Sequence, residues 1–268
     1  MSSSQPVIKW SGSKRLLANK IVDSFPKNYG TYFEPFLGGG SILLKLLPQK
    51  AVCVDINESL IDFWNRLKNN PKELCDDYEE NWKLLQNDWH HFLFVRDRYN
   101  REHSGSDLLF LSRTCVNGLI RYNKKGEFNN SLHYSRPGIA PSRLRKLLME
   151  ISPKIQNYTF ICGDYSQILP LIGNNDLVYL DPPYAHTKSM YYGAIQYDPL
   201  WDFVKAAKLQ GAKCVLSFDG VTEKRAYDVS VPDDVFPRKI LLDSGLSTFN
   251  KVIDGESNKT KESLFFSY

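Results

Sequence analysis

The chain has 268 residues, a formal net charge of +4 and 24% charged residues. Its length suits one α/β domain with a large insertion, or two small domains, and the modest charge excludes a general polyanion-binding protein but not a local basic patch. The five cysteines contain no Cys-x-x-Cys pair, which predicts reduced thiols in a cytoplasmic protein and neither a disulfide framework nor a zinc site. The polar first residues and the lack of a stretch of about 20 apolar residues predict neither a signal peptide nor a membrane span.

A short loop near the start of the chain is the first motif. Residues 8–14 read Ile-Lys-Trp-Ser-Gly-Ser-Lys and precede an amphipathic segment that predicts a helix from about Leu16 to Phe25. The small residues 11–13 predict a tight turn, whose free N–H groups can donate hydrogen bonds to an anionic or carboxylate group. A purely structural turn is the alternative.

A glycine-rich loop follows over residues 32–47. The pattern predicts a strand ending near Glu34, then three glycines at 38–40, then a helix from Ile42 to Leu47. Glycines let the backbone approach a ligand closely and place it at a helix N-terminus. A second predicted strand, residues 52–55, ends at Asp55, at a spacing from the glycines that suits an acid reaching ribose hydroxyls. Together these features indicate a nucleoside-bearing cofactor without saying which one.

From about Asn57 to Ser152 the sequence changes to helical segments rich in charged and aromatic residues. We therefore predict a mainly helical insertion over residues 57–152, with residues 1–56 and 153–268 forming the cofactor-binding domain. Within the insertion, residues 108–121 are compatible with a helix, and residues 123–142 form a polar loop.

Basic residues concentrate in the second half of this insertion. Residues 113–146 contain eight basic side chains and one acid, Glu127, so the rest of the chain is slightly acidic. A solvated basic face is the ordinary explanation, but interleaved aromatic and amide side chains between Tyr122 and Tyr134 favour nucleic acid. The basic residues are Arg113, Arg121, Lys124, Lys125, Arg136, Arg143, Arg145 and Lys146.

Strand patterns resume after the insertion, at residues 158–162, 177–180, 213–218, 239–242 and 264–267. With the first two, this makes about seven strands, most of them separated by helical segments, which predicts an α/β fold with a largely parallel, helix-covered sheet. Asp164, just after its strand, is placed to accept a hydrogen bond from an adenine amine. The histidines show no ligand spacing, so we assign no metal.

The strand at residues 178–180 stops at Asp181-Pro182-Pro183-Tyr184. Consecutive prolines cannot donate to a strand ladder, so the strand ends at Asp181, at the edge where open α/β sheets bind ligands. The Asp181 carboxylate and the Pro182 carbonyl are suited to accept the two N–H bonds of a planar exocyclic amine, and the Tyr184 ring to stack on its base. A strand-to-turn junction with a surface aspartate is the alternative.

The order of these motifs resembles the Dam-type DNA adenine methyltransferases, the alpha group of amino-methyltransferases. The resemblance rests on residues 9–14, 34–40, 117–129 and 181–184. It implies a Rossmann-like methyltransferase fold with a helical target-recognition insertion, and S-adenosylmethionine as the methyl donor. It also implies methylation of the N6 amine of an adenine flipped out of double-stranded DNA. We expect a monomer that acts on DNA in the cytoplasm, and we leave open whether it is paired with a cognate restriction endonuclease, belongs to a phage or acts as an orphan enzyme.

The resemblance also implies roles for individual residues. The catalytic residues are Asp181, Pro182, Pro183 and Tyr184. The cofactor-binding residues are Trp10, Gly12, Lys14, Glu34, Phe36, Gly38, Gly40, Asp55, Asp164, Tyr165 and Asp181. The DNA-binding residues are Lys9, Asn117, Leu119, Arg121, Asn123, Lys124, Lys125 and Asn129, and Arg121 occupies the position at which family members read a guanine.

The sequence departs from the family pattern at four places: Ser13, Val116, residues 130–132 and residues 185–190. Family members have a second glycine at the first position, some carry an aromatic wedge at the second, and Val-Pro-Phe is common at the third. We therefore assign no recognition sequence. The competing hypotheses are the same fold acting on cytosine N4, on an RNA base or on a protein amide, and a DNA-binding module that has lost catalysis.

Overall fold

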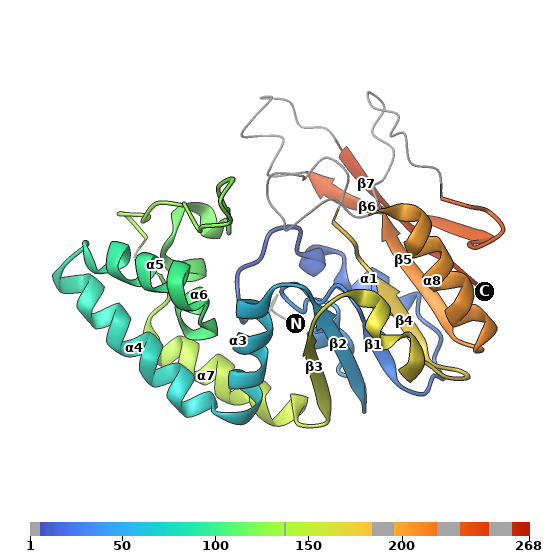
Figure 1. Cartoon of the computed structure of the whole chain (residues 1–268), viewed down its shortest axis with the longest axis horizontal. Helices are drawn as coiled ribbons and strands as arrows, with labels where there is room; N and C mark the ends of the chain where they lie inside the picture. Colours follow the sequence, from blue (N-terminus) through green and yellow to red (C-terminus); the bar gives the residue numbers. More distant parts are fainter. Residues whose placement is uncertain (1–5, 137, 184–195, 219–230, 247–258) are drawn as a thin grey trace.

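The computed structural model describes residues 6–136, 138–183, 196–218, 231–246 and 259–268 (Figure 1). In these residues, seven strands form one sheet in the order β3-β2-β1-β4-β5-β7-β6. The strands are β1 Tyr32–Glu34, β2 Ala51–Asp55, β3 Tyr158–Cys162, β4 Leu177–Leu180, β5 Lys213–Phe218, β6 Arg238–Leu246 and β7 Lys259–Phe266. Neighbours from β3 to β5 run parallel, and β7 is antiparallel to both β5 and β6. The prediction of a largely parallel seven-stranded α/β sheet is confirmed.

The sheet is buried on both faces. Alternate residues such as Tyr32 and Tyr179 belong to a core with helices α1 (Ala18–Asp23), α2 (Leu43–Leu46) and α3 (Glu58–Asn69). The 3₁₀ helix η1 (Lys14–Leu16) leads into α1. Their neighbours Phe33 and Val178 belong to a second core with 3₁₀ helix η4 (Tyr165–Leu171) and α8 (Tyr197–Leu209). This double covering explains why the central strands are continuous apolar runs.

The helices predicted beside the first two motifs are shorter than expected. The segment from Leu16 to Phe25 forms η1 and then the six-residue α1. Helix α2 has only four residues and ends at Leu47, which is left-handed with φ 48° and precedes Pro48. A residue before proline is disfavoured in the helical region, which accounts for the stop.

Strand β1 lies at the centre of the sheet, between β2 and β4. The chain runs outward from β1 through β2 to β3 and then returns to pair β4 with the other side of β1, so the direction of winding reverses between β1 and β4. A crevice opens beyond the carboxyl ends of the strands at such a reversal, and it is the preferred ligand site of open α/β sheets.

The insertion is mainly helical, as predicted. It contains α4 Pro71–Asn87, α5 His91–Glu102, α6 Gly105–Thr114, η2 Val116–Gly118, α7 Pro141–Ile151 and η3 Ser152–Ile155. Helix α6 is buried along its whole length and packs on α3, α4 and α5. Helix α3 also packs on β2 and β3, where Trp64 stacks on Phe160 with ring centroids 5.4 Å apart. Because α3 contacts both parts, the division at residues 57 and 152 stays a prediction.

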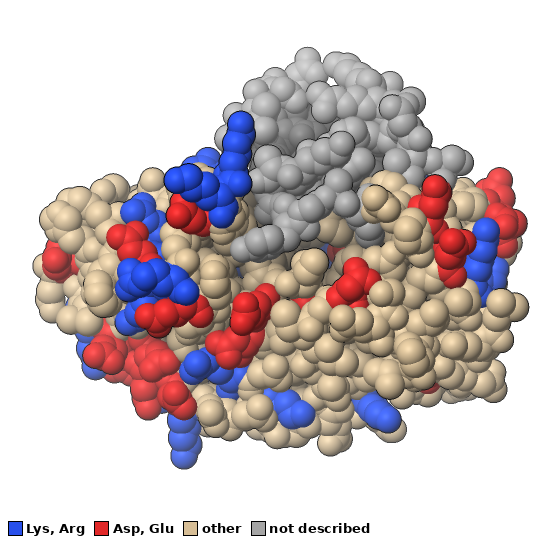
Figure 2. All heavy atoms as spheres, viewed as in Figure 1, with Lys and Arg blue, Asp and Glu red and all other residues tan. Residues whose placement is uncertain are grey.

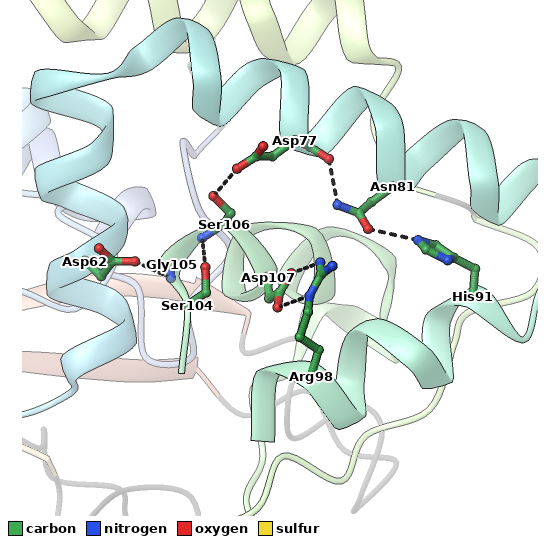
Figure 3. A network of polar contacts seen from close by, with 9 residues as sticks. All are labelled: Asp62, Asp77, Asn81, His91, Arg98, Ser104, Gly105, Ser106 and Asp107. Atoms are coloured by element: carbon green, nitrogen blue, oxygen red, sulfur yellow. Dashed lines mark hydrogen bonds and ion pairs between the residues drawn. The ribbon is translucent and has the colours of Figure 1, made fainter. Parts of the chain in front are cut away.

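Polar contacts fix α6 within the insertion (Figure 3). The Gly105 amide donates to Asp62 Oδ2 at 2.7 Å, and a Cβ at Gly105 would lie 2.2 Å from the Phe63 backbone nitrogen, so only glycine fits there. The buried Asp107 carboxylate accepts from Arg98 Nε at 2.8 Å and from a second nitrogen of the same guanidinium. Bidentate pairing compensates the cost of burying this acid.

None of the helices in the described part of the chain has the length and apolar composition of a membrane span.

Candidate active site

The glycine loop after β1 is shaped by two tryptophans. Gly38 and Gly40 have φ of +50° and +63°, a region that side chains other than glycine rarely adopt. A Cβ at Gly40 would lie 2.5 Å from the Trp64 ring, and one at Gly38 would lie 3.0 Å from the Trp10 ring. Trp64 Nε1 donates to the Gly38 carbonyl at 3.3 Å. The loop therefore requires glycine for its conformation and for its close packing.

Asp55, at the end of β2, holds this loop in place. Its Oδ2 accepts from the Gly38 amide at 2.9 Å, and its Oδ1 accepts from the Asn57 amide at 2.9 Å. Burial raises the pKa of Asp55, and these backbone hydrogen bonds oppose the rise. Because a carboxylate offers about four lone-pair sites, these bonds still leave acceptor capacity for a ligand hydroxyl.

The loop before η1 lies beside the glycine loop. Ser13 and Ser41 share a hydrogen bond between their hydroxyl oxygens at 2.7 Å. Gly12, with φ +74°, is exposed, and Trp10 is half-buried over the glycines. The two loops that the sequence assigned to cofactor binding are therefore adjacent.

Two aromatic rings and a capping aspartate lie in the segments that follow β1 and β3. The rings of Phe36 and Tyr165 are 5.3 Å apart, so the segments after β1 and β3 meet. Asp164 is exposed, and its Oδ1 caps η4 by accepting from the Ser166 amide at 2.9 Å. Its second carboxylate oxygen is not used by that cap, so ligand binding and capping are compatible.

Asp181 directly follows β4 and is paired with a buried lysine. Its Oδ1 lies 3.0 Å from Lys14 Nζ, and the same ammonium lies 3.3 Å from Glu262 Oε1 on β7. Burial lowers the pKa of Lys14, but the two carboxylates outweigh it and the pKa is raised. Pro182 is buried and Pro183 half-buried, whereas Tyr184 lies outside the described residues.

Glu262 was missed in the sequence, although a signal was present. Alternate residues of a strand share one face, and Glu262, Leu264 and Phe266 therefore point to the same side of β7. Leu264 and Phe266 are fully buried. An acid in phase with buried apolar residues indicates a side chain with a specific cationic partner.

Glu34, the last residue of β1, is buried near Asp181. Burial raises its pKa to about 8, the nearby Asp181 charge adds to the rise, and a hydrogen bond donated by the Tyr32 hydroxyl to Oε2 at 2.9 Å opposes it. Glu34 is therefore mainly protonated and neutral at pH 7. The resemblance implies a cofactor-binding role for Glu34, but only 3% of the residue is accessible.

The insertion presents Arg121 on an exposed segment. Its Nε donates to Asn129 Oδ1 at 3.0 Å, and the Asn129 amide donates to the Arg121 carbonyl at 3.0 Å. Asn117 is exposed with φ +58°, and Leu119 is half-buried. These contacts orient the Arg121 guanidinium without burying it.

Lys124 and Lys125 lie at the tip of a tight turn and are exposed. The Asn123 amide donates to the Glu127 carbonyl at 2.8 Å, and Asn123 Oδ1 accepts from the Lys125 amide at 2.8 Å. Asn123 therefore shapes the turn that carries the lysines. Lys and Arg side chains gather at the upper edge of the insertion in Figure 2.

Two of the eight basic residues counted between residues 113 and 146 are held by contacts within the protein. Arg113 is buried and donates to the carbonyls of Pro6 and Val7, and burial lowers its pKa to about 10. Arg145 pairs with Asp76 and Glu79 of α4. A count of charges in sequence does not distinguish side chains that face inward, and α6, which carries Arg113, is buried on all sides.

Lys9 links the first loop to the insertion. A Cβ on Gly118 would lie 2.3 Å from Lys9 Cδ, so the lysine stem lies directly against this glycine. Burial and the charge of Arg113 lower the pKa of Lys9.

Comparison with known proteins agrees with this geometry. The family model of the D12 class N6 adenine-specific DNA methyltransferases matches residues 10–253. The chain belongs to this family. It is therefore an adenine-specific DNA methyltransferase, and the family's activity implies S-adenosylmethionine as methyl donor and DNA as substrate. The family assignment favours adenine N6 over the cytosine and RNA alternatives.

Several relatives are similar over most of the chain. The Type II methyltransferase M.MjaIII of Methanocaldococcus jannaschii is 31% identical over 244 residues, which cover 80% of this chain and 83% of the relative. The DNA adenine methylase of Vibrio cholerae is 30% identical over 190 residues, covering 69% and 67%. A solved structure, the rRNA methyltransferase AviRa of Streptomyces viridochromogenes, is 14% identical with a TM-score of 0.42 over 99% of this chain and 92% of that one. That likeness is too low to add to the assignment.

The protonated Glu34 predicts a pH-dependent stability. Its pKa is about 8 in the folded chain and near 4.5 when unfolded, so the folded state binds the extra proton between these values. The free energy of unfolding should therefore fall as pH rises from about 5 to about 8, by up to about 1.4 kcal/mol per pH unit from this residue. Glu34→Gln, which keeps an oxygen for the Tyr32 hydroxyl, should remove that slope. Denaturant unfolding of both proteins across this pH range tests it, and identical slopes would show that Glu34 is ionised in the fold.

Proposed function

We propose that the loops beyond β1, β2 and β4 bind S-adenosylmethionine and bring it to an adenine extruded from double-stranded DNA. The single observation that supports this most is the Asp181 carboxylate, held by Lys14 at 3.0 Å beside the point where β1 and β4 separate. A fixed, ionised acceptor at that edge suits an amine that must be aligned for reaction.

The residues around the glycine loop fit the cofactor. The loop offers a backbone without side chains at Gly38 and Gly40, and Asp55 keeps acceptor sites for hydroxyls while it holds the loop. Phe36 and Tyr165 provide apolar faces for a base. We assign the remaining contacts to Trp10, Gly12, Lys14 and Asp164. Glu34 would contribute from its buried position at the end of β1. When bound, S-adenosylmethionine supplies an electrophilic methyl group on a sulfonium.

Asp181 and Pro182 would activate the target amine. The lone pair of an aromatic amine is delocalised into its ring, so the amine is a poor nucleophile. If the Asp181 carboxylate and the Pro182 carbonyl accept its two hydrogens, the nitrogen is drawn toward tetrahedral geometry and its lone pair becomes available. Positioning and electrostatics then contribute most of the catalysis. Pro183 would fix the turn, and the stacking role proposed for Tyr184 falls outside the described residues.

The insertion would read the DNA. Arg121 is exposed and oriented by Asn129, so it can fork onto guanine O6 and N7. Lys124 and Lys125, on the turn shaped by Asn123, are better placed for phosphates, which carry no sequence information. We extend the DNA-binding surface to Lys9, Asn117 and Leu119. The Type II names of two relatives suggest pairing with a cognate restriction endonuclease.

Substitutions of Asp181 and Asp55 should impair the enzyme at different steps. Asp181→Ala should abolish methylation and leave cofactor affinity largely intact, because the carboxylate serves the target amine. Asp55→Ala should instead weaken cofactor binding by roughly 10- to 100-fold, the size of about 1.5 to 3 kcal/mol for hydrogen bonds to a charged group. Calorimetry with S-adenosylmethionine separates the two, and Asp234→Ala, at an exposed surface carboxylate, is the matched control. An equal loss of cofactor affinity in both variants would refute this division.

Substitutions of Arg121 and Lys124 should change DNA recognition in different ways. Arg121→Ala should relax preference at one base pair, by about 1 to 3 kcal/mol of discrimination. Asn129→Ala should weaken the same preference to a smaller extent, because it removes the acceptor that orients Arg121. Lys124→Ala should weaken binding to all sequences and lower the salt slope by about one unit. The measurement is methylation of a library of single-base site variants. If Arg121→Ala keeps the wild-type ranking at every position, Arg121 is not a base reader.

A further inference from the structure

Glu262 is an acid on the inward face of a strand. It lies on β7 in phase with Leu264 and Phe266, which are fully buried, and its own side chain is 13% exposed. Burying a carboxylate costs several kcal/mol unless it is paired and hydrogen-bonded. A buried carboxylate of this kind therefore has a function, or local contacts offset the free energy lost by burying its charge.

The compensation comes from two side chains. The Ser217 hydroxyl on β5 donates to Glu262 Oε1 at 2.6 Å, and Lys14 Nζ lies 3.3 Å from the same oxygen. The Lys14 ammonium also lies 3.0 Å from Asp181 Oδ1. Since β5 lies between β4 and β7 in the sheet, the strand order itself places Asp181 and Glu262 on two sides of one buried cation.

We propose that Glu262 is a positioning residue for methyl transfer, which acts through Lys14 on Asp181. The inference rests on the role proposed above for Asp181. A lysine ammonium has three donors on a flexible stem, and without the charge of Glu262 it is drawn onto Asp181 and competes with the target amine for its oxygens. Glu262, fixed by Ser217, shares the ammonium and leaves acceptor sites on Asp181 for that amine.

The same arrangement keeps Lys14 charged. Burial lowers its pKa, and the charges and hydrogen bonds of Asp181 and Glu262 together reverse this effect. Loss of the Glu262 charge removes one of these contributions and therefore lowers the pKa of Lys14. The pKa of Lys14 thus reports whether Glu262 shares the ammonium with Asp181.

Glu262→Gln tests the proposal, because it keeps the size of the side chain and an oxygen for the Ser217 hydroxyl. We expect kcat to fall roughly ten-fold, the effect of one hydrogen bond to a charged group, with little change in the Kd of S-adenosylmethionine by calorimetry. The pKa of Lys14, followed by NMR in the cofactor-free protein labelled at lysine, should fall. Glu262→Asp, which keeps the charge, should recover part of both. If Glu262→Gln does not fold, Ser217→Ala should show the same pattern at smaller size.

The matched control is Glu150→Gln, which breaks the exposed Glu150–Lys154 pair at 2.9 Å and should change neither kcat nor the pKa of Lys14. A wild-type kcat in Glu262→Gln overturns the proposal. A lower kcat with an unchanged Lys14 pKa overturns it as well, because that result describes a purely structural residue. Methylation retained by Asp181→Ala would instead overturn the role of Asp181, whatever Glu262→Gln does, so the two failures are distinguishable.

Discussion

The pairing of β1 with β4 is the contact on which the site depends, because it brings two chain segments that are distant in sequence to one edge of the sheet. Both faces of these strands are covered by apolar cores, so carboxylates are accommodated only where the strands end. Three adjacent strands end in an acid: Glu34 on β1, Asp55 on β2 and, just after β4, Asp181. The fold gives each a different environment. Glu34 is protonated in an apolar setting, Asp55 accepts backbone amides, and Asp181 faces an ammonium. Environment, and not residue type, separates their roles.

The recognition segment is attached to this edge by the first residues of the chain. Arg113 of α6 donates to the backbone of residues 6 and 7, and the stem of Lys9 lies against Gly118. The next residue, Trp10, covers the glycine loop. The same short segment therefore contacts both the insertion and the cofactor loop, and α3 joins the two parts through a continuous core. Buried contacts of this kind hold Arg121 and its turn in a defined position relative to Asp181, which a reaction on one base of a recognition site requires.

The sequence was sufficient for β1 to β5, because each is a largely apolar run bounded by turn residues, and for the order of the motifs. It predicted β6 and β7 as residues 239–242 and 264–267, shorter than Arg238–Leu246 and Lys259–Phe266, because the outer parts of both strands are polar. It also located Asp55 and Asp181, which directly follow or end such runs. It failed where the answer depends on tertiary contacts. Arg113 looks like any helix-surface arginine until α6 is found to be buried on all sides. The role of Glu262 depends on a strand order in which β5 lies between β4 and β7, and local sequence patterns do not encode that order. The protonated state of Glu34 likewise follows from burial beside Asp181, not from its place in a motif.

The central claim is that Asp181, at the end of β4, serves transfer of a methyl group to adenine N6 in DNA. Modified-base sequencing of DNA from cells that express this chain measures the modified base and its sequence context together. The account predicts N6-methyladenine at one short recurring sequence, and none at that sequence in cells that express Asp181→Ala. N4-methylcytosine in place of methyladenine, or the same methyladenine pattern with Asp181→Ala, would contradict it.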